Sequence, residues 1–154
     1  MSDSFRQAKG RKVISRTSAG DLGTISHLLV DADQRRITAM VVGRGRNAQL
    51  VDWAQVSAFG PDAVMVNDDE SVRPPADDRE RAATDGRLEL VAKRVLTEKG
   101  NELGVLDDVT FDPGTGAMET LLIGEREVPA ASLLGSGPYA VVLDASQEPA
   151  PLEP

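Results

Sequence analysis

The segments Gly20-Asp-Leu-Gly-Thr-Ile25 and Gly100-Asn-Glu-Leu-Gly-Val-Leu106 are two versions of one short motif. Around them, residues 14–43 align without a gap with residues 95–124, at an offset of 81. Further on the offset becomes 77, because the first copy carries a loop of seven residues, Arg44–Leu50, where the second has three. A Leu-Gly pair, an Asp, a Gly and a Gly-Pro recur in the same order, which indicates an internal repeat.

Each copy has the pattern of short β-strands. Residues 25–30 and 106–111 end in alternating apolar and polar residues, and turn-forming residues follow both segments. A dense apolar run comes next, at residues 37–42 and 118–123, which predicts a β-hairpin in each copy. Short strands bury little on an open sheet, so we expect each copy to close into a small barrel. The predicted fold class is therefore all-β, with two tandem small barrels.

The repeat also predicts the domain organisation. We expect the two barrels at residues 12–66 and 93–143, packed side by side through apolar faces in the manner of a homodimer. Residues 67–92 between them are acidic and contain two adjacent prolines, which is typical of a linker with at most a short helix. Residues 1–11 and the proline-containing residues 144–154 are expected to be flexible.

Composition limits the chemistry open to this chain of 154 residues. It has no cysteine and one histidine, which excludes disulfides, thiolate zinc sites and multi-histidine metal sites. The longest apolar run is far shorter than a membrane-spanning helix, and no secretory signal is visible, so a cytoplasmic protein is expected.

Charge is distributed unevenly along the chain. The net charge is -8, but residues 1–66 carry 9 Lys/Arg against 6 Asp, giving +3. Residues 91–154 carry 4 basic against 11 acidic residues, giving -7. Because phosphate neutralisation supplies most non-specific nucleic-acid affinity, strong overall nucleic-acid binding is not expected. A local basic patch on the first copy remains open, as does an ordinary solvated surface.

The repeated motif resembles the PRC-barrel family. The residues that carry this resemblance are the two Leu-Gly motifs, the turn aspartates Asp31 and Asp112, and the glycines Gly43 and Gly124. Two closing segments complete it, Gly60-Pro-Asp-Ala-Val and Gly137-Pro-Tyr-Ala-Val. The family occurs in the cytoplasmic part of the photosynthetic reaction-centre H subunit and in the C-terminal domain of a ribosome maturation factor. The resemblance implies a small, strongly bent β-barrel that binds other proteins rather than catalysing a reaction.

The expected function is accordingly a non-enzymatic protein–protein interaction module, an adaptor without cofactor or metal. Its protein partner is not identified by the sequence. Two alternatives stay open. One is a ribosome-assembly or RNA-associated factor that uses the basic first copy, and the other is a peripheral subunit of a membrane complex.

Arginines in the first copy are the candidate site for a partner or an anion. Guanidinium forks and exposed backbone N–H groups of a glycine-rich loop suit anionic groups. The candidates are Arg35, Arg36, Arg44, Arg46 and Asn47, with Lys9, Arg11 and Lys12 upstream. The alternative is an ordinary solvated hairpin tip.

Other residues admit a chemical and a structural interpretation. Five aspartates could serve a hard cation, but Asp at the start of a turn commonly binds its own backbone. These are Asp31, Asp33, Asp107, Asp108 and Asp112. His27 has no visible Ser/His/Asp constellation around it, which favours a structural role. Trp53 and Phe59 are expected in the core, with an interface role as the alternative.

Overall fold

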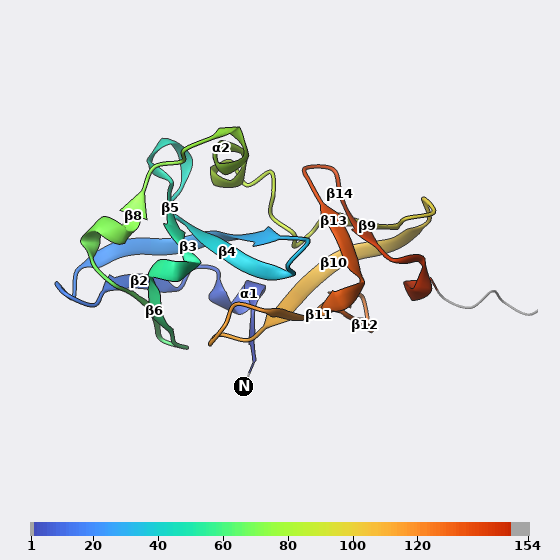
Figure 1. Ribbon diagram of the computed structural model, residues 1–154, viewed down its shortest axis with the longest axis horizontal. Coiled ribbons are helices and arrows are strands. Elements are labelled where there is room, and N and C mark those ends of the chain that lie inside the picture. The colour runs from blue at the N-terminus through green and yellow to red at the C-terminus, as the bar shows by residue number, and fades with distance from the viewer. Residues whose placement is uncertain (1, 149–154) are drawn as a thin grey trace, which may run out of the picture.

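The structure is a computed structural model that describes residues 2–148. Two seven-stranded sheets lie side by side along the long axis of the molecule (Figure 1). The first comprises β2 (Lys12–Ser15), β3 (Asp21–Asp31), β4 (Arg36–Val42), β5 (Gln49–Asp52), β6 (Val56–Phe59), β7 (Ala63–Val66) and β8 (Val72–Arg73). The second comprises β9 (Arg94–Thr97), β10 (Glu102–Phe111), β11 (Met118–Ile123), β12 (Arg126–Pro129), β13 (Leu133–Ser136), β14 (Ala140–Leu143) and β1 (Asp3–Ser4). The predicted all-β class with two tandem copies is confirmed.

The two sheets share one topology. Their orders are β6-β7-β2-β3-β4-β5-β8 and β13-β14-β9-β10-β11-β12. In the first copy, β3 pairs with β2 along its first part and with β4 along the rest, which bends the sheet sharply. Gly23 lies at this bend with φ 125°, and a Cβ there would lie 2.9 Å from the side chain of Val42. Across residues 2–148, no strand pairing joins the two ends of either sheet, so backbone hydrogen bonds do not close a barrel.

The structure corrects the repeat alignment of the first strand by one residue. Val13 of β2, not Ile14, is the counterpart of Val95 in β9, because both lie opposite the glycine of the Leu-Gly motif. The turn that follows is one residue longer in the first copy, residues 16–20 against 98–101. A shift of one residue exchanges the two faces of a strand. In the corrected register Val13 and Val95 are both fully buried.

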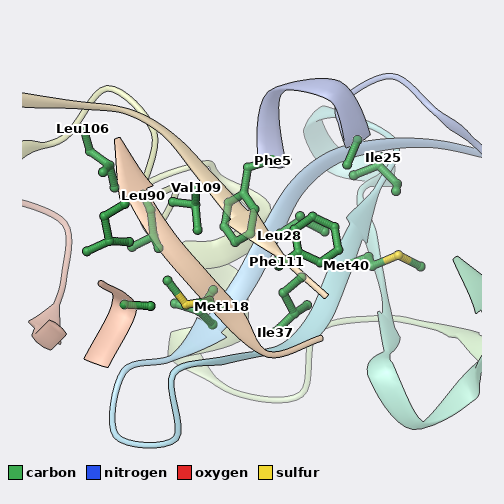
Figure 2. Close-up of a cluster of buried hydrophobic side chains, with 14 of the residues drawn as sticks. Phe5, Ile25, Leu28, Ile37, Met40, Leu90, Leu106, Val109, Phe111 and Met118 are labelled. Atoms are coloured by element: carbon green, nitrogen blue, oxygen red, sulfur yellow. The ribbon is translucent and has the colours of Figure 1, made fainter. Parts of the chain in front are cut away.

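One hydrophobic core extends through both copies, as the apolar faces predicted. Figure 2 shows side chains of both copies in this cluster, with Phe111 of β10 among them. The Phe111 ring centroid lies 5.6 Å from that of Phe5 and 5.3 Å from that of Phe59, both edge-to-face. Trp53 stacks on Phe59 with centroids 5.6 Å apart. Trp53 and Phe59 therefore belong to the contact between the copies.

The turns of the two long hairpins meet around an approximate twofold axis. The Ile37 N–H donates to the Gly116 carbonyl at 2.8 Å, and the Met118 N–H donates to the Arg35 carbonyl at 2.9 Å. Gly116 and Met118 are the counterparts of Arg35 and Ile37, so the repeat alignment exchanges the two bonds. A twofold axis of this kind relates the subunits of an isologous homodimer. Here it relates two halves of one chain.

The linker folds onto the first copy. Helix α2 (Asp78–Thr84) begins after Asp77, whose carboxylate accepts a hydrogen bond from the Glu80 N–H. Ala83 of α2 and Leu88 pack on the outer face of β3, β4 and β5. The apolar residues under this cover are Leu29, Ala39, Val41, Ala48 and Leu50. In Figure 1, α2 lies above β4 and β5.

An ion-pair cluster fastens the linker to β5. Arg73 lies 2.6 Å from Glu80 of α2 and 2.8 Å from Asp52 of β5. The Arg73 guanidinium holds the pKa of Glu80 at about 2, because its hydrogen bonds outweigh the raising effect of burial. The N–H of Ala76 adds a further hydrogen bond to this carboxylate at 2.7 Å.

The N-terminal segment differs from the flexible one expected. Asp3 and Ser4 pair with Phe111 and Thr110 of β10, and helix α1 (Phe5–Ala8) follows directly. Phe5 enters the shared core, so burial of one aromatic ring orders a segment that looks polar in sequence. At the other end, Glu148 accepts a hydrogen bond from Thr97 at 2.6 Å, which orders residues 144–148. Residues 149–154 of the expected flexible tail lie outside the described residues.

Candidate functional site

The five candidate residues fall at opposite ends of β4. Arg35 ends the β3–β4 turn and Arg36 begins β4, whereas Arg44, Arg46 and Asn47 belong to the β4–β5 loop. A strand of this length spans roughly 20 Å. The structure therefore separates the candidates into two groups rather than one patch.

Arg35 and Arg36 take part in the contact between the copies. Arg35 Nε donates to the Leu133 carbonyl at 3.2 Å, and Arg36 Nη2 donates to the Thr115 carbonyl at 2.8 Å. Arg36 also forms an isolated β-bridge with Ala117. Both guanidinium groups thus bind backbone carbonyls of the second copy.

The loop that holds Arg44, Arg46 and Asn47 is anchored at both ends. Gly43 follows β4 with φ 85°, and the Ser26 hydroxyl donates to the Gly43 carbonyl. A 3₁₀ turn over Gly45–Asn47 follows, and Ala48 is buried in the cluster beneath the linker. The three polar residues between these anchors are exposed. Their side chains make no hydrogen bond or ion pair with residues 2–148.

A surface hollow of about 430 Å³ lies beside this loop. It is lined by Lys9, Ser26, His27, Gly43, Arg44, Gly45, Thr84 and Asp85. Lys9, one of the upstream candidates, therefore joins Arg44 at the hollow. Arg11 and Lys12 do not line the hollow, and they pair with Asp3 and Asp21, each at 2.6 Å.

His27, which also lines the hollow, contacts Glu89 of the linker. Its Nδ1 lies 3.1 Å from Glu89 Oε2, at an angle outside hydrogen-bond geometry, and Lys9 Nζ lies 3.1 Å from Glu89 Oε1. Burial raises the pKa of Glu89, but the adjacent His27 and Lys9 side chains lower it by a larger amount, so the net shift is downward. Gly86 packs against the ring, where a Cβ would lie 3.0 Å from His27 Nε2. This arrangement fits the structural role expected for His27.

The aspartates bind backbone groups. Asp31 Oδ1 accepts hydrogen bonds from the N–H groups of Asp33 and Gln34, at 2.8 and 3.3 Å, and Asp112 Oδ1 accepts one from Gly114 at 2.8 Å. Asp107 and Asp108 likewise accept from the N–H groups of Gly124 and Arg6, at 2.6 and 3.0 Å. Within the described part of the chain, no group of three or more His, Asp or Glu side chains is placed to hold a metal ion.

The second copy exposes an apolar surface that sequence reasoning missed. Val105, Leu134 and Tyr139 are exposed to 49%, 44% and 70%. They are separated in the sequence and each adjoins residues of the core, and only the pairing of strands brings them to one sheet. The available signal was a position-by-position comparison of the copies, which shows Thr24, Ser57 and Asp62 in their places.

Comparison with known proteins supports the resemblance. The family model described as PRC-barrel domain matches twice, at residues 3–73 and 87–145. No match is found among the curated proteins. None of the helices within residues 2–148 has the length and hydropathy that a membrane crossing requires. The two matches cover most of the chain, and the protein therefore belongs to the PRC-barrel family, with two copies of the domain in tandem.

Proposed function

We propose that the protein is a non-enzymatic cytoplasmic adaptor that binds an acidic protein surface through the Arg44–Asn47 loop. PRC-barrel domains occur in protein-interaction modules, which supports the general class. The observation that carries the specific proposal is that the rest of the described chain leaves the side chains of Arg44 and Arg46 free to bind a partner. Both are exposed and make no hydrogen bond or ion pair with residues 2–148, whereas Arg35 and Arg36 bind the second copy.

The charge around the loop favours a protein carboxylate over a nucleic-acid backbone. Two guanidinium groups can bind two carboxylates in bidentate fashion. A phosphate chain requires a longer basic tract, because each neutralised phosphate adds to affinity. The surroundings of the loop supply no such tract, since Lys9 is paired with Glu89 and Asp85 lines the same hollow.

Affinity purification from the native cell with loop variants tests the proposal. We expect Arg44→Glu/Arg46→Glu to reduce recovery of the partner at least tenfold relative to the unaltered chain, about 1.4 kcal/mol or more. The matched control is Arg81→Glu/Arg87→Glu, which makes the same change of charge at two exposed linker arginines. It should leave recovery unchanged.

Equal recovery with both variants would contradict the loop as the binding site. Recovery of ribosomal particles that is lost after RNase treatment would instead support the RNA-associated alternative. Recovery only with a membrane fraction would support the membrane-complex alternative.

A further inference from the structure

The exposed apolar residues of the second copy lie on, or directly beside, neighbouring strands of one sheet. Val105 of β10 lies opposite Arg94 of β9, and the Arg94 guanidinium lies 5.3 Å from the centre of the Tyr139 ring. One step along the strands, the half-buried Leu96 lies opposite Val142 of β14. On the neighbouring β13, Gly135 lies opposite Val142, and Leu134 precedes it at an irregularity in the pairing. We call the surface formed by Leu96, Val105, Leu134, Tyr139 and Val142 the β9–β14 face.

The first copy shows that the fold does not require an apolar surface at this place. The counterparts of Val105, Leu134 and Tyr139 are the polar residues Thr24, Ser57 and Asp62. The framework around them is otherwise kept. Arg94 pairs with Glu102 at 2.7 Å, and the equivalent Lys12 pairs with Asp21 at 2.6 Å. The two copies thus differ at the three solvent-exposed positions of this face, which are apolar in the second copy and polar in the first.

On the outer surfaces of the two long hairpins, by contrast, the residues are apolar where the linker covers them and mostly polar where it does not. The apolar outer surface of β3, β4 and β5 lies beneath the linker. At the equivalent positions of the second copy, which α2 does not cover, the residues are mostly polar: Thr110, Thr120, Leu122, Glu125 and Glu127. The β9–β14 face departs from this pattern, because it is apolar and remains exposed within residues 2–148. Contiguous exposed apolar surface marks interaction sites in soluble proteins.

We propose that the β9–β14 face docks a protein segment whose apolar side chains are flanked by lysine or arginine. The inference rests on the adaptor function proposed above and gives it a second contact, separate from the Arg44–Asn47 loop. The charge of the second copy favours this partner. Residues 91–154 carry a net charge of -7. Around β9 and β14, the acidic residues Glu98, Glu102, Asp144 and Glu148 outnumber the basic residues Lys93, Arg94 and Lys99.

The same charge disfavours other occupants of the face. A second copy of this chain would bring two acidic surfaces together, and like charges across an interface oppose association. Anionic lipid and nucleic acid are repelled for the same reason. A basic, partly apolar protein segment gains from both the apolar contact and the surrounding field.

Binding of the full chain to two pools of short synthetic peptides tests the proposal. The pools have the same apolar and aromatic content, but one is lysine-rich and the other glutamate-rich. We expect preference for the lysine-rich pool by at least about tenfold. The variant Val105→Thr/Leu134→Ser/Tyr139→Asp should abolish the preference. Its fold is expected to persist because the first copy carries these residues at the same places, and an unchanged unfolding midpoint checks this.

Controls separate this inference from the adaptor loop. Arg44→Glu/Arg46→Glu should retain lysine-rich peptide binding, and a monomer in sedimentation supports the choice of partner. Equal binding of both pools, unchanged binding by the triple variant, or a dimer that the triple variant dissociates would each overturn the inference. None of these results bears on the proposed function. That proposal fails only if Arg44→Glu/Arg46→Glu recovers the cellular partner as fully as the unaltered chain does.

Discussion

The two copies share a backbone and differ in what lies on its outside. In the first copy, the outer surface of the long hairpin is apolar and covered by α2 and Leu88, while the edge sheet around β2 and β7 carries polar residues. In the second copy the hairpin surface is polar and the edge sheet around β9 and β14 is apolar. The comparison shows that the two copies keep the fold through similar buried residues, whereas their outer surfaces carry different residues and make different contacts.

The copies also differ in how the free edge of the long strand is occupied. In the second copy, β1 pairs with Thr110 and Phe111 of β10. At the equivalent edge of β3, Arg79 of α2 donates to the Val30 carbonyl at 2.7 Å. Backbone groups at the same edge of the long strand are thus hydrogen-bonded by a strand in one copy and by a side chain in the other. The difference arises because different segments of the chain flank the two copies.

The largest expected effect comes from the core that the copies share. Phe111→Ala removes the ring that contacts Phe5 and Phe59 and should lower the free energy of unfolding by about 3–5 kcal/mol. The counterpart in the first copy is Val30, so Val30→Ala, which removes fewer carbons, should have a smaller effect. Urea unfolding followed by far-UV circular dichroism measures both. Equal effects would contradict the central place of Phe111.

A glycine at the twofold contact provides the next comparison. Gly116→Ala would place a Cβ 2.9 Å from the Trp53 ring at φ 79°, so we expect a loss of about 2–4 kcal/mol. Gly124→Ala is the matched control, because Gly124 has φ 62° and open space around it. Its expected loss is about 1–2 kcal/mol, from backbone strain alone. Similar losses for the two variants in denaturant unfolding would show that the Trp53 contact does not hold the copies together.

The fastening of the linker to the first copy should depend on pH. The folded-state pKa of Glu80 is about 2, against an ordinary value of 4.5, so its contribution to stability is full above about pH 4.5 and is lost as the pH falls toward 2. Glu80→Gln should lower the free energy of unfolding by about 1–2 kcal/mol at neutral pH. The difference should shrink across the same pH range. A difference that is constant from pH 7 to pH 2 would exclude the ion pair as its source.

The smallest expected effect is a gain. Ala92 has φ 77°, and its counterpart in the first copy, Gly10, has φ 86°. Ala92→Gly relieves left-handed strain but adds chain entropy to the unfolded state, for a net stabilisation of about 0.5 kcal/mol. Ala54→Gly, at an exposed alanine outside the left-handed region, should instead destabilise. A loss of stability in Ala92→Gly would contradict the observed backbone conformation.

The repeat made much of the fold predictable from sequence. Leu22-Gly23 and Leu103-Gly104 mark the bends, and the alternation after them predicts the hairpins correctly. The N-terminal segment was not predictable, because Phe5 is a single apolar residue among polar ones and its burial depends on Phe111, more than a hundred residues away. The sequence alignment pairs Ile14 with Val95, one residue out of register, because the turn after β2 is one residue longer in the first copy. The positions of the glycines alone do not reveal this difference in turn length.

The candidate site was only partly predictable. The extra length of the Arg44–Leu50 loop indicated an exposed segment, and Arg44, Arg46 and Asn47 are exposed there. Nothing in the sequence distinguishes Arg35 and Arg36 from them, because their binding to Leu133 and Thr115 depends on the twofold packing of the copies.

Calorimetric unfolding of the full chain tests most directly whether the copies form one unit. A single core shared by both predicts one transition, with a calorimetric enthalpy equal to the van't Hoff enthalpy. Trp53 fluorescence, which reports on the contact, should follow the same transition. Two transitions, or a calorimetric enthalpy well above the van't Hoff value, would show that the copies unfold independently and would contradict the shared core.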